Sequence, residues 1–184
     1  MKPVSGNKEY KEASNEHINR FKMAHMIGVA EYMRERAKDY GLNPDVMYTV
    51  GFLHDIGYVK GRAEHEKHGA EILGAIGVDE DILFAIAHHG ENAREVQREY
   101  GKESITPEFV LTLEADMSVN AQGYRVGFEG RLADIEKRYG KEHIAVATVK
   151  DNIAFIKEYQ QEHGIGKPVS LYHKHGHGKS HSRE

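Results

Sequence analysis

Apolar residues recur every three or four positions along most of the chain, which is the spacing of one buried face of an α-helix. The longest pattern predicts a helix over about 14–40, with Ser14 or Asn15 as its N-cap and Gly41 as its stop. Similar patterns predict helices at about 44–54, 64–76, 80–88, 106–119, 128–139 and 142–162. No segment alternates apolar and polar residues between hairpin turns, so the sequence predicts an all-α fold.

Start and stop signals support these boundaries. Asn43-Pro44 and Thr106-Pro107 each place a capping side chain before a proline in the first turn of a helix. The charged stretch 91–104 fits either a surface helix or a loop. The glycines that end other predicted helices are Gly77, Gly140 and Gly164.

The chain has 184 residues, a length that fits one domain with a substantial core. We expect a flexible start over residues 1–13, a helical domain over 14–163 and a disordered, His-rich tail over 164–184. The tail histidines are either a natural metal-binding tract or a remnant of cloning. They carry no weight in the assignment of a catalytic site.

Composition narrows the chemistry further. The formal net charge of -4 gives no strong signal for nucleic-acid binding. The chain has no cysteine, so nitrogen and oxygen ligands must hold any metal ion. The first residues lack an apolar stretch of signal-peptide length, and no run approaches the ~18 apolar residues of a membrane span. We therefore expect a cytoplasmic protein without a membrane partner.

Adjacent His54 and Asp55 stand at the end of a predicted helix, where imidazole nitrogen and carboxylate oxygen can reach one ion. Met47, Val50 and His54 share the inward face of that helix. By itself this dipeptide favours a hydrogen-bonded core histidine beside a C-terminal aspartate over a metal site, since a two-residue match is weak evidence.

His25 and Asp116 also lie on inward helix faces. His25 is one turn after Phe21 and one turn before Val29, and Asp116 continues the stripe that begins at Phe109. A buried, ionised aspartate is costly unless it meets a cation or several donors. Each residue alone fits a structural role, but three separate helices can converge on one metal ion.

With these residues, the chain resembles the HD superfamily of metal-dependent phosphohydrolases. The matching segments are His25-Met26-Ile27-Gly28-Val29-Ala30, Leu53-His54-Asp55-Ile56-Gly57 and Leu113-Glu114-Ala115-Asp116-Met117, and the resemblance covers about 14–125. It implies an all-α, single-domain HD-type bundle of about six to seven helices. It also implies that His25, His54, Asp55 and Asp116 bind a metal ion.

Many members of the superfamily hold a second ion through two further histidines. His65 stands four residues before Gly69 and fits the first position better than His68. His89 fits the second position, with His88 as the alternative. The resemblance then makes Asp55 the bridging, catalytic carboxylate. One or two divalent ions are expected, from iron, manganese, cobalt, nickel or zinc, with magnesium as a further option.

Tyr58 stands where many relatives carry a lysine directly after the His-Asp-x-Gly motif. Lys60 is therefore a candidate catalytic and phosphate-binding substitute, and Arg62, Arg125 and Arg131 are further candidates for substrate phosphates, although each fits ordinary surface charge as well.

The resemblance implies hydrolysis of a nucleotide or another small phosphorylated substrate. Two alternatives stay open: a di-iron oxygenase with the same ligands, and an inactive helical binding module. Assembly into a homo-oligomer is also open.

Overall fold

The computed structural model describes residues 22–166, and within this range the all-α prediction is confirmed. The first described helix covers residues 22–36 and continues into the 3-10 turn η1 (Ala37–Tyr40). The helices that follow are α2 (Pro44–Leu53), α3 (His65–Gly74), α4 (Glu80–His88), α5 (Ala93–Tyr100), α6 (Pro107–Asp116), α7 (Gly127–Tyr139) and α8 (Ile144–Glu162), with 3-10 turns η2 (Ile56–Val59) and η3 (Lys102–Ser104). An isolated β-bridge joins Val119 to Arg125.

The predicted helix starts are confirmed where side chains cap them. The Asn43 side chain accepts hydrogen bonds from the backbone N–H groups at the start of α2, and the Thr106 hydroxyl does so at the start of α6. The stretch that fitted either a helix or a loop contains α5, whose start Asn92 caps in the same way. Helix ends were less well predicted, since α6 ends at Asp116 instead of about 119 and α3 ends at Gly74 instead of about 76.

Some sequence predictions lie outside the described residues. These are the flexible start, the cap at Ser14 or Asn15, and the His-rich tail from residue 167 onward. Within residues 22–166, no helix combines the length and the apolar character needed to cross a membrane.

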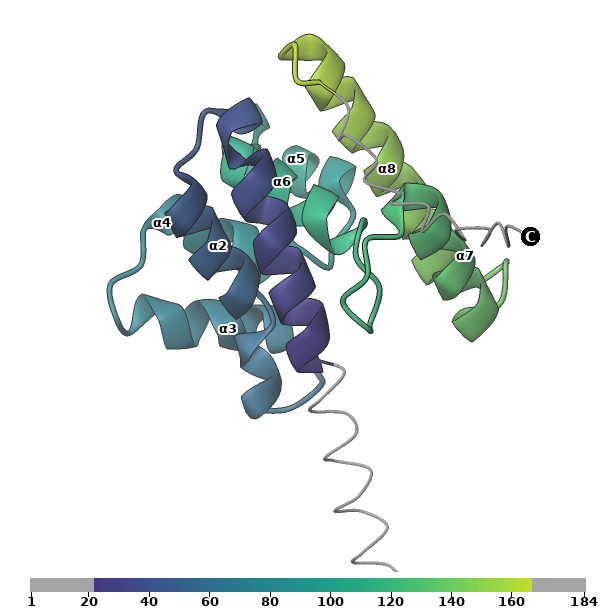
Figure 1. Cartoon of the computed structure of the whole chain (residues 1–184), viewed down its shortest axis with the longest axis horizontal. Coiled ribbons are helices and arrows are strands. Elements are labelled where there is room, and N and C mark those ends of the chain that lie inside the picture. The colour runs from purple at the N-terminus through teal and green to yellow at the C-terminus, as the bar shows by residue number, and fades with distance from the viewer. Residues whose placement is uncertain (1–21, 167–184) are drawn as a thin grey trace, which may run out of the picture.

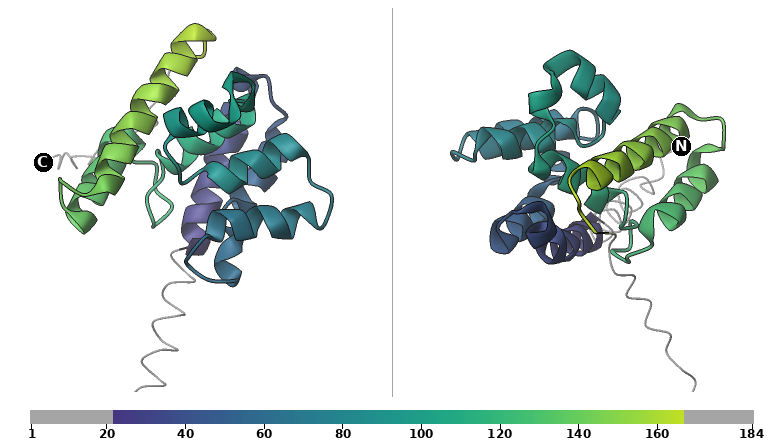
Figure 2. Two further views of the ribbon diagram at one scale, coloured as in Figure 1. Left: turned by 180° about the vertical axis from the view of Figure 1, so that it is seen from behind. Right: turned by 90° about the horizontal axis from the view of Figure 1, so that it is seen from above.

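The molecule has two parts that face each other (Figure 1). The first helix, α2, α3 and α4 lie on one side, and α7 and α8 lie side by side on the other. Figure 2 shows the same division from behind and from above. Helix α6 contacts α2, α4 and α8, and every residue from Phe109 to Ala115 is buried. Helix α6 is therefore the central helix of the fold.

A buried polar cluster ties the first helix to α6. The Glu114 carboxylate is fully buried and accepts hydrogen bonds from the hydroxyls of Tyr32 and Tyr40 and from the Arg36 guanidinium. Because these donors neutralise and solvate the carboxylate, the charge is tolerated inside the core. The cluster also fixes the first helix, which carries His25, against the helix that carries Asp116.

Two close approaches of the backbone depend on glycine. A Cβ at Gly51 would lie 2.8 Å from the Cα of Ala30, so only glycine lets α2 pack this tightly on the first helix. A Cβ at Gly57 would collide with the backbone of His65 and Gly69. These contacts hold the start of α3 against the turn that follows His54 and Asp55.

Candidate metal centre

His54 is the residue that follows α2, and its side chain is fully buried. Its Nδ1 lies 2.7 Å from the carbonyl oxygen of Gly51, to which it donates a hydrogen bond, so Nε2 carries the lone pair. Burial lowers the pKa of His54 to about 4, which keeps the imidazole neutral near pH 7. No protein group within the described chain forms a hydrogen bond with the buried Nε2. An unpartnered buried nitrogen with a free lone pair is what a metal ligand requires.

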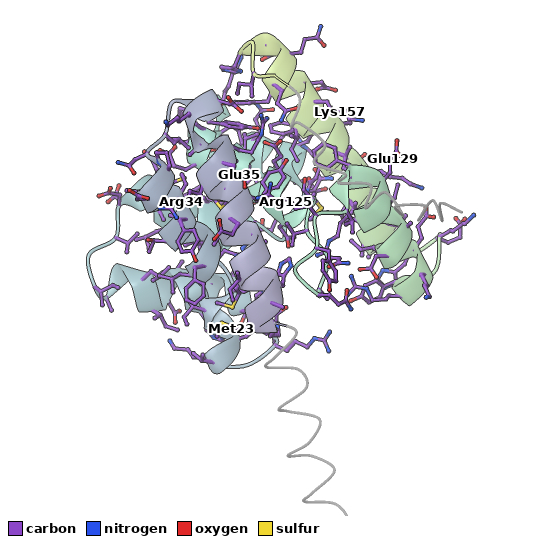
Figure 3. All side chains as sticks on the ribbon, in the orientation of Figure 1. Met23, Arg34, Glu35, Arg125, Glu129 and Lys157 are labelled. Atoms are coloured by element: carbon purple, nitrogen blue, oxygen red, sulfur yellow. The ribbon has the colours of Figure 1, made fainter. Side chains whose placement is uncertain are left out.

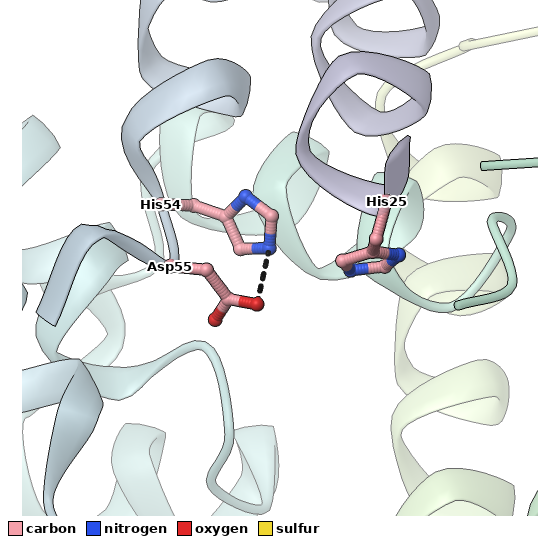
Figure 4. Close-up of side chains that lie close together, drawn as sticks. All are labelled: His25, His54 and Asp55. Carbon is pink, nitrogen blue, oxygen red and sulfur yellow. Dashed lines mark ion pairs between the residues drawn. The ribbon is translucent and has the colours of Figure 1, made fainter. Parts of the chain in front are cut away.

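Three ligand atoms gather at this position. The donor atoms of His25, His54 and Asp55 all lie within 4.8 Å of one another. Figure 4 shows His25 facing this pair from the first helix, across the gap from His54 and Asp55. The predicted convergence of separate helices on one point is therefore present for these residues.

Asp116 joins this group through His25. Its Oδ1 lies 2.9 Å from Nε2 of His25 and 3.5 Å from Nη2 of Arg131 on α7. Burial alone would raise the pKa of Asp116, but the Arg131 charge and the contact with His25 outweigh burial and hold this pKa well below its usual range. Asp116 is therefore an ionised carboxylate available to a cation.

A second group consists of Asp55, His65 and His89, whose donor atoms also lie within 4.8 Å of one another. Oδ1 of Asp55 is 3.2 Å from Nε2 of His65 and 3.5 Å from Nε2 of His89. Asp55 therefore belongs to both groups, as expected of a bridging carboxylate. Burial disfavours charge on His89, but the hydrogen bond to Asp55 outweighs burial and raises the pKa of His89 to about 9.

The two choices between neighbouring histidines agree with this geometry. His65 and His89 lie in the second group, whereas His68 and His88 belong to neither group. Nδ1 of His88 instead lies 3.1 Å from a carboxylate oxygen of Glu91. His89 makes the same contact as His54. Its Nδ1 donates to the carbonyl of Ile86 at 2.7 Å, which directs Nε2 toward Asp55.

A pocket of about 420 Å³ opens onto both groups. His25, Asp55, His65, His89 and Asp116 all contribute to its wall. The other charged and aromatic lining residues are Lys22, Arg62, Arg131, Arg138, Tyr58, Glu66 and Tyr139. Basic side chains beside ionised carboxylates are a lining that can hold an anionic ligand together with metal ions.

Two of the predicted substrate-binding residues lie elsewhere. The ammonium of Lys60 is 3.0 Å from the Glu71 carboxylate on the surface, and Lys60 does not line the pocket. Arg125 forms a two-pronged ion pair with Glu35 of the first helix (Figure 3). Both side chains are held by local carboxylates, so the structure does not place Lys60 as a catalytic group or Arg125 as a phosphate ligand. Arg62 and Arg131, the other two candidates, line the pocket.

Four charged or aromatic lining residues were missed from the sequence, namely Lys22, Glu66, Arg138 and Tyr139. Lys22 is three residues before His25, and Arg138 is seven residues after Arg131, so each shares a helix face with a residue that had been singled out. Tyr139 is adjacent to Arg138. The helical spacing was a usable signal for Lys22 and Arg138, but only the packing of α7 toward the HD motif shows that both face one pocket.

The chain matches the HD domain family over residues 23–117. This segment is just over half of the chain and contains every residue of both metal-ligand groups as well as Asp116, so the chain belongs to the HD domain family. This family places the chain in the superfamily of metal-dependent phosphohydrolases.

Among individual relatives, the Ribonuclease Y of Thermotoga maritima is 36% identical over 96 residues, which are 50% of this chain and 17% of that protein. The Ribonuclease Y of Fervidobacterium nodosum is 34% identical over 98 residues, again 17% of its length. An uncharacterized protein of Methanocaldococcus jannaschii is 32% identical over 140 residues, which are 68% of this chain and 81% of that protein. No solved structure matches this chain.

Proposed function

We propose that this chain is a metal-dependent phosphohydrolase that acts on a nucleotide or a related small phosphate ester or anhydride. The observation that carries the proposal is the place of Asp55, which belongs to both ligand groups and lines a pocket that also contains four basic side chains. Membership of the HD domain family supports the same class of reaction.

The side chains present fit divalent metal ions. The buried, unpartnered Nε2 of His54 and the mixed nitrogen and oxygen donor set suit iron, manganese, cobalt, nickel or zinc, and the carboxylates also suit magnesium. One ion would be held by His25, His54, Asp55 and Asp116, and a second by Asp55, His65 and His89. Such ions, when bound, supply an activated water and offset negative charge on a phosphoryl group.

The chain's own residues bind and orient the substrate. Lys22 and Arg62 line one part of the pocket wall, and Arg131 and Arg138 line the part contributed by α7. Basic side chains of this kind hold phosphoryl oxygens through charge-assisted hydrogen bonds. Arg131 has a second role because its charge keeps Asp116 ionised.

The size of the pocket supports a small substrate. A volume of about 420 Å³ lies within the range of about 300 to 1,000 Å³ that is usual for small-molecule sites. The names of the Ribonuclease Y relatives suggest RNA as the alternative substrate. The four basic side chains favour an anionic, phosphorylated substrate over an uncharged organic one.

The test measures the phosphate that the purified protein, with its metal content known, releases from a series of substrates. The substrates are nucleoside mono-, di- and triphosphates, and cleavage of a short oligoribonucleotide is followed separately by the length of its products. We expect release from at least one of the nucleotides, loss of that activity in Asp55→Ala, and unchanged activity in the control Lys67→Ala. Lys67 is a suitable control because it is exposed and paired with Glu64 on α3. Cleavage of the oligoribonucleotide alone, or an Asp55→Ala variant as active as the parent chain, would contradict the proposal.

A further inference from the structure

The ring of Tyr58 lines the pocket and contacts both Lys22 and His65. The Lys22 ammonium lies over the ring face in a cation–π contact. The imidazole of His65 stacks on the same ring, with centroids 3.9 Å apart and planes 26° apart. Tyr58 therefore connects Lys22 to a residue of the second metal-ligand group.

The basic side chains of the pocket differ in their counter-charges. On α7, Asp134 lies 2.6 Å from Arg138 and 3.8 Å from Arg131, and Arg131 also lies 3.5 Å from Asp116. In contrast, neither Lys22 nor Arg62 forms an ion pair with a carboxylate among residues 22–166. The positive charges without a local partner are therefore on the Tyr58 side of the pocket.

The positive charges of Lys22 and Arg62 also repel each other. Burial lowers the pKa of Lys22 to about 8, the Asp55 charge counteracts this change, and the Arg62 charge adds to it. Two neighbouring like charges, one of them half-buried, cost free energy until an anion joins them. The arrangement is that of a site prepared for a ligand with negative charge.

We propose that Lys22 and Arg62 form the phosphate subsite of this pocket, and that the Tyr58 ring positions the Lys22 ammonium beside Asp55. The inference rests on the proposed function and specifies which basic residues contact the phosphoryl oxygens of the substrate. It gives Lys22 the role that sequence reasoning assigned to Lys60. Lys22 and Arg62 are binding residues, whereas Tyr58 is a positioning residue.

The test uses inorganic phosphate as the probe and titration calorimetry of the metal-loaded protein as the readout. Lys22→Met and Arg62→Met should each weaken phosphate binding about tenfold, since each removes a charge-assisted hydrogen bond. Lys67→Met is the matched control and should bind phosphate as the parent chain does. Equal affinity for phosphate in the parent chain and in both pocket variants, or no phosphate binding at all, would overturn the proposal.

Tyr58 is tested by a pair of substitutions. Tyr58→Phe keeps the ring and should retain phosphate affinity, whereas Tyr58→Leu removes the cation–π contact and should weaken binding several-fold. Metal content is measured in both variants because the ring also touches His65. If Tyr58→Leu keeps both its metal and its full phosphate affinity, the positioning role is wrong.

The outcome separates this inference from the proposed function. Weaker phosphate binding in Lys22→Met and Arg62→Met, without hydrolysis of any nucleotide by the parent chain, supports the subsite and contradicts the function. Hydrolysis with an unchanged KM and unchanged phosphate affinity in these variants supports the function and contradicts the subsite.

Discussion

The direction in which each histidine presents its nitrogens is set by single hydrogen bonds. His54 and His89 each donate from Nδ1 to the carbonyl three residues earlier, and Nε2 of both lies near a carboxylate oxygen of Asp55. The family resemblance had singled out both residues, with His88 as the alternative to His89. It could not show that His25 instead uses Nδ1 for the carbonyl of Asn120, because that contact depends on the loop after α6.

The two-group arrangement predicts the effect of removing one histidine. His65→Ala or His89→Ala should lower the bound metal toward half of the parent value, because each removes a ligand of the second group and leaves the first intact. Metal content measured by elemental analysis checks this expectation, with circular dichroism as the control for folding. Full metal content in both variants would contradict a second ion.

The lowered pKa of Lys22 predicts how substrate binding depends on pH. Lys22 is charged below about pH 8 and neutral above it, so KM should rise as the pH increases from about 7 to about 9. The charged and titratable groups that face Lys22 are Tyr58, Arg62, Asp55, Asp116 and Glu66. Lys22→Arg keeps its charge throughout this range and should show a flatter KM profile. Identical profiles for the two proteins would exclude Lys22 as the source.

Among the elements, α6 carries two carboxylates with separate roles. Asp116 contacts His25 of the first ligand group, whereas Glu114, two residues earlier, accepts a hydrogen bond from Tyr40. The Tyr40 hydroxyl in turn accepts a hydrogen bond from Gln160 of α8. Apolar spacing predicted that Asp116 points inward, but the burial of Glu114 was not expected from its charge. The partners Tyr32, Arg36 and Tyr40 make that burial tolerable, and they come from a distant part of the chain.

The Glu114 cluster should contribute strongly to stability. Glu114→Gln removes the buried negative charge that pairs with Arg36. We therefore expect a loss of about 3 kcal/mol in the free energy of unfolding. Glu35→Gln breaks an exposed pair with Arg125 and should cost less than about 1 kcal/mol. Urea unfolding monitored by circular dichroism measures both. Similar costs for the two variants would show that the buried cluster is not a main source of stability.

The starts of helices were predicted better than the ion-pair partners of charged side chains. Asn43 and Thr106 cap helices through bonds to residues two or three positions away, so the local sequence contains the whole signal. Lys60 and Arg125 are held by Glu71 and Glu35, which come from other elements. Local spacing carries no information on such contacts. The assignment of both residues to the substrate therefore could not take these carboxylates into account.

At the scale of the whole molecule, the pocket joins the HD segment to a part of the chain outside it. The family match ends at residue 117, but α7 adds Arg131, Ile135 and Arg138 to the pocket wall. The residues of the two ligand groups could therefore be singled out from the family resemblance, whereas most of the pocket wall that α7 contributes could not. Substrate choice in this chain should depend on α7 as much as on the HD motif.

A substitution on α7 tests this division of roles. Arg138→Ala should raise KM several-fold with little change in metal content, because Arg138 lines the pocket and belongs to neither ligand group. Arg98→Ala on α5 is the control, since Arg98 is exposed, forms an ion pair with Glu95 at 3.5 Å and does not line the pocket. Steady-state kinetics on the best nucleotide substrate give both values. An unchanged KM in Arg138→Ala would limit recognition to the HD segment.

The central claim is that this histidine and aspartate centre hydrolyses phosphate esters by metal-assisted chemistry that needs no oxygen. The most direct measurement is phosphate release under strictly anaerobic conditions, after removal of metal and addition of manganese, cobalt or magnesium. The account predicts that at least one of these ions restores activity in the parent chain and that none restores it in Asp55→Ala. Activity that returns only with iron and oxygen would contradict the account and establish the oxygenase alternative.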